Sequence, residues 1–295
     1  MSKKRTFGLC LGLIVALAAP AALAQMTPPP MSAPPMGAPP MAPPEHNPIE
    51  PKALELLKAA SAALAGAKTV KFDATATYEH AAANGQPLFF TTLSQVTLQR
   101  PDKLRVITLG DGTPDEFYYD GKTMTAYIPS ADLVAVADAP PTLDQLLDVV
   151  WDKAAIYFPF GDLLVSDPYA DLAKHLHSAF YVGRSIAVGG VPTDMIAIAT
   201  DDVAGEIWLG VDDHLPRMIR VVYAHEPAHA LYQTEFSNWK LGEAVDASAF
   251  TSEKAAKAKH IPFAAPGDEP PPAHPAPPAP PAQPAPSEPP AMDRY

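Results

Sequence analysis

The sequence predicts a mainly β domain with a few helices (α+β class), in which about eleven antiparallel strands form one curled sheet. Three observations support this fold class. Polar and apolar side chains alternate along many short segments, as they do in strands with one face in water. Turn dipeptides such as Asn84-Gly85 and Asp120-Gly121 separate several of these segments. Other segments, such as residues 133–136, are apolar throughout and therefore need cover on both faces.

The first element is a helix that begins at Pro51, a residue suited to the first helical position. Leucines recur along one face of residues 51–65, and Gly66 ends the helix. The period then changes from helical to two-residue alternation over residues 70–78, which predicts a strand with one exposed face.

The remaining strands are bounded by turn residues and by Pro101, which interrupts one apolar run. Six strands precede the middle of the chain and five follow it. Their predicted ranges are 70–78, 88–100, 104–109, 116–119, 122–128 and 133–137, then 180–188, 195–200, 206–211, 216–224 and 231–241.

Two helices are predicted between these groups of strands. Thr142 and Gln145 form a capping-box pattern before apolar residues that recur at helical spacing over residues 143–151. Asp167-Pro168 marks the start of a second, shorter helix. Because three helices cannot cover both faces of so many strands, we expect the sheet to curl and to enclose an interior that the helices plug or lid. A sandwich with a filled core is the alternative that the pattern leaves open.

The ends of the chain indicate export. Lys3, Lys4 and Arg5 precede a short apolar run, and Ala22 and Ala24 have the small side chains of a secretory cleavage site. We therefore predict a signal peptide over residues 1–24, and the run is too short for a membrane span. Most of the 37 prolines lie in two biased segments, which predicts a Pro/Met-rich disordered linker over residues 25–48 and a Pro-rich disordered tail over 262–295. Spacers or docking strips for an envelope protein are the alternative for these segments. The folded domain then covers residues 49–261.

Composition excludes several classes of function. Cys10, the single cysteine, lies in the predicted signal peptide, so thiol catalysis, disulfides and thiolate metal sites are excluded from the mature protein. The formal net charge of −12 argues against nucleic-acid binding. No later segment is apolar enough for an integral membrane protein.

One motif suggests a zinc protease. His225-Glu226-Pro227-Ala228-His229 matches H-E-x-x-H, in which two histidines on one helix face bind zinc beside a general base. Pro227 would cost such a helix about 3 kcal/mol, and the segment lies between two predicted strands. We therefore interpret it as a hairpin loop. His175 and His177 are predicted to lie on different sides of a short helix, and the sequence contains no other catalytic constellation.

Several short motifs carry a family resemblance over about residues 54–251. They are Arg-Pro-Asp-Lys-Leu-Arg at 100–105, Tyr-Asp-Gly-Lys at 119–122, Pro-Phe-Gly-Asp at 159–162 and Ala-Val-Asp-Ala-Ser-Ala-Phe at 244–250. The sequence resembles an uncharacterised family of predicted periplasmic proteins in the LolA/LolB-like lipoprotein-carrier superfamily. That resemblance implies an open antiparallel β-barrel with lid helices and a cavity for acyl chains. It also implies that Arg100, an arginine before a proline on an early strand, holds the lid by hydrogen bonds. The segment 138–181 is longer than in the carrier, and both proline-rich tails are additional.

Pattern and resemblance together predict a soluble periplasmic carrier for a lipid, a lipoprotein acyl chain or another elongated apolar ligand. We expect no catalysis, cofactor or metal. The predicted cavity walls are Phe72, Phe90, Val96, Leu104, Val106, Met124, Ile207, Trp208 and Met218. The predicted lid residues are Leu146, Leu147, Val150 and Trp151. A protein-interaction or sensory module without lipid cargo is the alternative, and a zinc hydrolase is a distant third.

Overall fold

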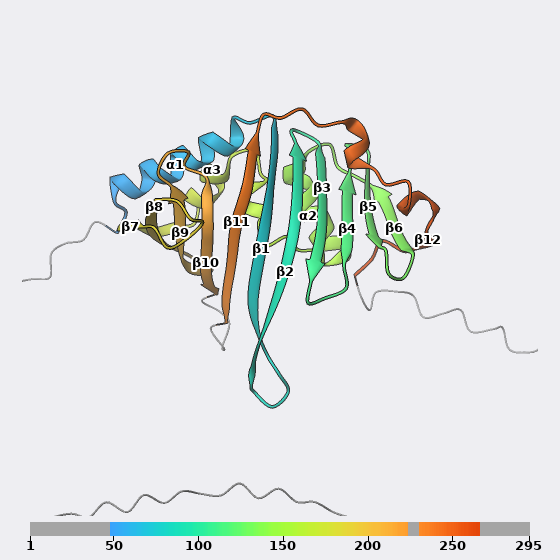
Figure 1. Cartoon of the computed structure of the whole chain (residues 1–295), viewed down its shortest axis with the longest axis horizontal. Helices are drawn as coiled ribbons and strands as arrows, with labels where there is room; N and C mark the ends of the chain where they lie inside the picture. The colour runs from blue at the N-terminus through green and yellow to red at the C-terminus, as the bar shows by residue number, and fades with distance from the viewer. Residues whose placement is uncertain (1–47, 224–229, 266–295) are drawn as a thin grey trace, which may run out of the picture. The chain divides into compact units, whose positions relative to one another are not determined.

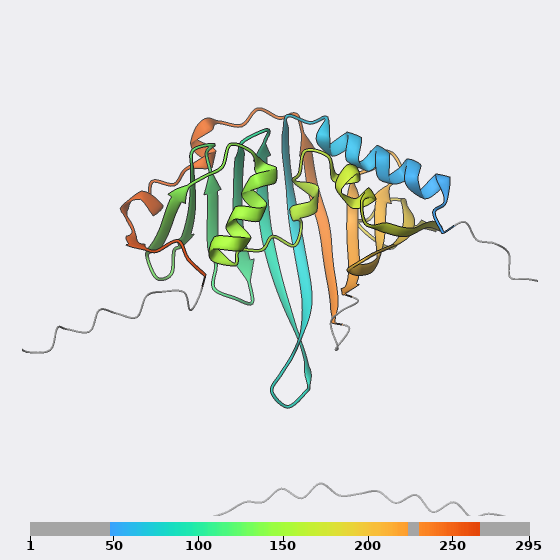
Figure 2. The same ribbon diagram turned by 180° about the vertical axis from the view of Figure 1, so that it is seen from behind.

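The computed structural model describes residues 48–223 and 230–265, which form a single curled sheet with helices on its concave side (Figures 1 and 2). The twelve strands of these residues run in the order β12-β6-β5-β4-β3-β2-β1-β11-β10-β9-β8-β7. Every neighbouring pair is antiparallel except β12 and β6. Because β7 and β12 do not pair with each other, the sheet stays open. The predicted fold class, an open and curled antiparallel sheet, is confirmed.

The elements follow the order in which the sequence predicts them. The helices are α1 (Pro51–Ala65), α2 (Leu143–Ala154) and α3 (Pro168–Ala173), with short 3-10 turns η1 (Gly161–Leu163), η2 (Ala247–Phe250) and η3 (Ala255–Lys257). The first six strands are β1 (Thr69–Ala81), β2 (Pro87–Gln99), β3 (Lys103–Gly110), β4 (Asp115–Tyr119), β5 (Thr123–Ile128) and β6 (Leu133–Asp138). The last six are β7 (Leu176–Ser185), β8 (Thr193–Thr200), β9 (Val203–Gly210), β10 (Pro216–Tyr223), β11 (Leu231–Leu241) and β12 (Lys259–Ile261).

Local capping explains where the helices begin. The backbone N–H of Gln145 donates to the hydroxyl of Thr142 at 3.4 Å, which caps α2 as predicted. Asp167 caps α3 by accepting from the N–H of Ala170 at 3.0 Å. The Ser61 hydroxyl of α1 donates to the same carboxylate at 3.1 Å, so α1 and α3 are held together.

Two cores divide the concave side of the sheet. Beneath α1, Leu56 and Leu57 pack with Ile196, Ile198 and Ile207 of β8 and β9. Beneath α2 and the segment that follows it, the larger core joins buried residues of β1 to β5 and β11 with the helix. Each core fills the space between one part of the concave face and the helix above it, so the helices cover the sheet through direct packing (Figure 2).

The convex side has its own cover at the β6 end of the sheet. Val134 and Tyr127 are buried there against Ala255 and Ala258 of the C-terminal segment. This packing explains the apolar side chain of Val134 on the convex face, whereas Val136 on the same face is 41% exposed. The same segment ends in β12, a strand of three residues that pairs with β6 and that the sequence pattern does not predict.

Candidate ligand cavity

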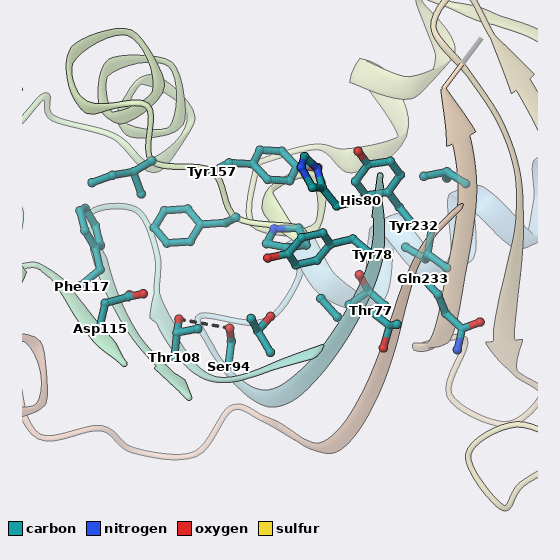
Figure 3. A pocket seen from close by; sticks show the side chains of 18 of the residues that line it. Thr77, Tyr78, His80, Ser94, Thr108, Asp115, Phe117, Tyr157, Tyr232 and Gln233 are labelled. Carbon is teal, nitrogen blue, oxygen red and sulfur yellow. Dashed lines mark hydrogen bonds between the residues drawn. The ribbon is translucent and has the colours of Figure 1, made fainter. Parts of the chain in front are cut away.

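A cavity of about 680 Å³ opens on the concave face between the sheet and residues 156–159, the segment after α2 (Figure 3). Strands β1 to β5, β10 and β11 form its floor and sides. The volume lies within the range of about 300–1,000 Å³ that is usual for small-molecule sites. The curl of the sheet therefore leaves usable space where the two helix-covered cores end.

One part of the cavity wall is apolar and aromatic. Phe117 of β4 and Phe158 of the segment above it meet with ring centroids 5.3 Å apart in an edge-to-face contact. Ala76, Ala126 and Ile219 add smaller apolar surfaces from three further strands. Such a wall favours the burial of alkyl or ring groups, at about 25 cal/mol for each Å² removed from water.

Tyrosines form a second part of the wall. The hydroxyls of Tyr157 and Tyr223 lie 3.3 Å apart, and the rings of Tyr223 and Tyr232 are edge to face at 5.0 Å. Tyr78 is paired with Tyr232 across β1 and β11. Burial raises the pKa of Tyr157, and the hydrogen bond with Tyr223 raises it further. The phenol of Tyr157 therefore stays neutral, and the group of tyrosines offers both ring faces and hydrogen bonds.

A polar row crosses the floor of the cavity on three neighbouring strands. Ser94, Thr108 and Asp115 are paired in register across β2, β3 and β4, so their side chains lie on the same face (Figure 3). The hydroxyls of Ser94 and Thr108 are 3.3 Å apart. Burial raises the pKa of Asp115, and a hydrogen bond from Thr108 opposes that shift. The cavity thus combines apolar walls with a defined polar edge.

A smaller pocket of about 290 Å³ lies on the other side of residues 156–158. Leu147 and Trp151, two of the predicted lid residues, line it. Trp151 is 57% exposed, and its ring meets Tyr157 at 6.3 Å. Leu146 and Val150, the other two predicted lid residues, are fully buried in the core beneath α2. The helix therefore packs one face on the sheet and presents Leu147 and Trp151 to the smaller pocket.

Five of the predicted wall residues lie in the core beneath α2 and do not line the cavity. These are Phe72, Val96, Leu104, Val106 and Met124, all nearly inaccessible to solvent. They point to the concave face as predicted, but α2 and residues 156–164 cover that part of the face. Phe90 also points to this face, and its ring stacks on Tyr78 at 5.6 Å.

The other three predicted wall residues correct the assignment of strand faces. Ile207 and Trp208 are adjacent on β9 and must point in opposite directions. Ile207 pairs with Ile219 on the cavity side of the sheet, although it packs under α1. Trp208 and Met218 pair with each other on the convex face, where the guanidinium of Arg220 lies 5.4 Å from the Trp208 ring. Trp208 and Met218 therefore point away from the cavity.

Arg100 contacts the segment that covers the sheet. Its Nη1 donates to the carbonyl oxygen of Leu164 at 2.8 Å, and burial lowers the pKa of its guanidinium. Nε and Nη2 of Arg100 are buried without a hydrogen-bond partner in the described part of the chain. The contact joins the end of β2 to the covering segment; whether Arg100 gates the cavity stays a prediction.

The histidine motifs give no metal centre in the described residues. The segment from His225 to His229 falls within residues 224–229, so the zinc-site hypothesis lies outside the described residues. His175 and His177 do not point to different sides. Both contact the carboxylate of Asp201, at 2.9 Å and 2.5 Å. Within residues 48–223 and 230–265, no set of three or more His, Cys, Asp or Glu side chains is arranged to hold a metal ion.

The residues that the sequence pattern did not single out are the tyrosines and the polar row. The predicted walls were all apolar side chains, so they did not include Ser94, Thr108 and Asp115. Alternation along residues 70–78 already places Tyr78 on the same face as Phe72. The turn between β3 and β4 sets the register that brings Asp115 beside Thr108, and the sequence does not specify that register.

Comparisons with solved structures give several similar chains. A chain of the Pseudomonas aeruginosa MucA/MucB complex is 20% identical, with 71% of this chain and 63% of that chain covered and a TM-score of 0.39. LprF from Mycobacterium bovis is 15% identical, with 67% and 96% covered and a TM-score of 0.40. A LolA superfamily protein from Nitrosomonas europaea is 11% identical, with 68% and 97% covered and a TM-score of 0.33. The fold assignment itself rests on the strand order and register.

Family membership comes from the sequence of the domain. None of the curated proteins matches the chain. In the described ranges, no helix has the length and hydropathy of a membrane span. A family model described as "Predicted periplasmic protein (DUF2092)" matches residues 53–264. This match confirms the predicted periplasmic localisation and the predicted relation to an uncharacterised periplasmic family: the chain belongs to the DUF2092 family of predicted periplasmic proteins.

Proposed function

We propose that this protein binds an amphiphilic molecule in the periplasm, with the apolar part of the ligand held in the cavity beneath residues 156–159. The observation that supports this function best is the cavity of about 680 Å³ on the concave face of the sheet. Its walls combine Phe117, Phe158 and Ile219 with phenol and hydroxyl groups at the edges. The proposal assigns binding or carriage and no chemical step.

The energetics of such a site are favourable for a chain-like ligand. Each buried methylene contributes about 0.8 kcal/mol, so roughly six to eight of them offset much of the entropic cost of association. The neighbouring pocket along Leu147 and Trp151 lies next to the same segment, 156–158. A longer ligand therefore has a second apolar surface within reach.

The test is binding of N-phenyl-1-naphthylamine, an uncharged dye that fluoresces in apolar surroundings. Ala76→Phe places a ring in the cavity, whereas Thr75→Phe places the same ring on the opposite face of β1. We expect dye binding by the wild type and by Thr75→Phe and at least about a tenfold loss with Ala76→Phe, which corresponds to about 1.4 kcal/mol. Thr92→Trp, at a half-buried position in the wall, serves as a second cavity-filling variant. Equal dye binding by all four folded proteins would refute a ligand site in the cavity.

A protein-interaction role is the second candidate, and one feature of the edge strand β7 favours it. Within the described residues, the outer edge of β7 carries one β-bridge, from Ile49 to Ala179, and the Glu50 carboxylate accepts a hydrogen bond from the Tyr181 N–H at 2.9 Å. Phe180 and Val182 of β7 are 45% and 47% exposed. An exposed strand edge with apolar side chains can pair with an extended segment of another protein. Cross-linking at residue 182 that captures one defined periplasmic protein would support this role.

A further inference from the structure

The charged side chains that line the cavity are mostly acidic. Among the described residues of the lining there is one histidine, His80, and there is no lysine or arginine. The lining includes three acidic residues, Glu79, Asp115 and Glu116. The nature of the polar end of a ligand therefore depends on which of these carboxylates point inward.

Strand alternation separates the three carboxylates. Asp115 shares its row with Ser94 and Thr108 and points into the cavity (Figure 3). Glu116 is the next residue of β4, so its side chain points to the convex face, where it accepts a hydrogen bond from the Tyr118 hydroxyl at 2.6 Å. Glu79 lies between Tyr78 and His80 on β1 and likewise points away from the face that these two share. Asp115 is thus the single acidic side chain of the described lining directed at the ligand space.

Asp115 also has no counter-ion. It forms no salt bridge with any residue of the described ranges. The residue is exposed at the edge of the cavity, but its carboxylate is desolvated enough by its neighbours for the pKa to be raised. Its polar neighbours in the row are the hydroxyls of Thr108 and Ser94, which can donate hydrogen bonds but carry no charge. A carboxylate beside an apolar cavity is stabilised most by a cation that arrives with the ligand.

We propose that the cavity selects amphiphiles with a cationic head group, which Asp115 binds at the polar row while the apolar chain extends along Phe117 and Phe158. This inference rests on the proposed function, since it names the ligand class for the same cavity. The chain has a formal net charge of −12, so its overall field also disfavours an anionic ligand. The rings of Tyr78, Tyr157 and Tyr232 also line the cavity, and aromatic ring faces attract cations.

Three probes with the same twelve-carbon chain and different head groups test the selectivity. Dodecyltrimethylammonium is cationic, dodecyl maltoside is neutral and dodecanoate is anionic. Each is titrated below its micelle concentration, in mildly alkaline buffer, into the full secreted chain, by displacement of N-phenyl-1-naphthylamine. We expect the cationic probe to bind about tenfold more tightly than the neutral one, since a contact with a charged group has about this effect. The anionic probe should bind most weakly.

Two single substitutions separate the role of Asp115 from general charge. Asp115→Asn and Glu116→Gln each remove one negative charge from adjacent positions of β4, but only the first changes the cavity face. We expect Asp115→Asn to abolish the preference for the cationic probe and to leave binding of dodecyl maltoside within about twofold, because a neutral head group gains nothing from the charge. Glu116→Gln should retain the wild-type preference.

The outcomes distinguish the two proposals. Binding of all three probes with equal affinity, or a preference that Asp115→Asn does not alter, would overturn the charge selectivity while the cavity remained a ligand site. Failure of every probe and of the dye to bind the folded wild type would overturn the proposed function itself. Loss of the preference in both variants would show a long-range field effect and would also overturn the assignment to Asp115.

Discussion

Replacement of Phe72 by alanine tests whether the centre of the concave face is packed core. Phe72 was predicted to line a ligand cavity, but its side chain is only 2% exposed. Its ring contacts Trp239, Phe160 and Phe236, with centroids at 4.5, 5.6 and 5.9 Å. A side chain enclosed in this way contributes to stability and leaves no room for a ligand.

The magnitude follows from the loss of the ring and from the hole it leaves. Substitution of a buried phenylalanine by alanine costs about 3–5 kcal/mol. Each aromatic contact adds about 0.5–1.5 kcal/mol beyond the buried area, so the upper part of that range is expected. In a domain of roughly 200 residues, each kcal/mol corresponds to about 2–4 °C in Tm, so a loss of about 4–5 kcal/mol should lower the Tm by about 8–20 °C.

The assay is urea unfolding followed by far-ultraviolet circular dichroism, with Phe72→Leu as the matched control. The leucine variant keeps most of the apolar volume and should lose clearly less stability than the alanine variant. A loss below about 1 kcal/mol in Phe72→Ala, well under the range for a packed ring, would refute the reasoning. The concave face would then be open as far as Phe72.

Three further predictions concern turns, caps and a surface carboxylate. Gly110→Ala should destabilise the protein by at least about 2 kcal/mol in urea unfolding. Gly110 has φ +136°, and a Cβ at this position would clash with the carbonyl oxygen of Thr91. The control Gly112→Ala should be close to neutral, because a Cβ there would have no atom within 4 Å. Thr142→Ala removes the cap of α2 and should cost about 0.5–1 kcal/mol, near the lower end for caps because the bond is long; no change in urea midpoint would contradict this role. Hydrogen bonds from His175 and His177 lower the pKa of the Asp201 carboxyl below 3.8 in the folded state. The contribution of Asp201 to stability is therefore present above pH 3.8 and is lost as the pH falls through the lower folded-state pKa. The difference in Tm between wild type and Asp201→Asn should shrink with acidification, and a constant difference would exclude the effect.

The architecture was predictable because its signals are local. Alternation over residues 70–78, the Asn84-Gly85 and Asp120-Gly121 turns and the break at Pro101 each act within a few residues. Signals of this kind identify eleven of the twelve strands of the described residues. The missed strand, β12, spans only Lys259–Ile261 and exists because the C-terminal segment returns to β6. Three residues are too few for alternation to mark a strand.

The cavity was less predictable because its position depends on contacts between distant segments. The alternation of β1 shows that Phe72 and Tyr78 share a face, but only the path of residues 156–164 decides that Phe72 is covered and Tyr78 is accessible. Face assignment also failed at β9, where Ile207 and Trp208 were both predicted to point inward. An apolar residue on the convex face can also be covered by a neighbouring side chain: the guanidinium of Arg220 lies over the Trp208 ring at 5.4 Å.

The measurement that tests the central claim most directly is mass spectrometry of organic extracts from the protein purified from the periplasm. Wild type, Ala76→Phe and Thr75→Phe are prepared in parallel, so that molecules bound outside the cavity appear equally in all three. We expect a stoichiometric amphiphile in wild type and Thr75→Phe and its loss from Ala76→Phe. No bound amphiphile in the wild type, or the same amount in the cavity-filling variant, would contradict this claim.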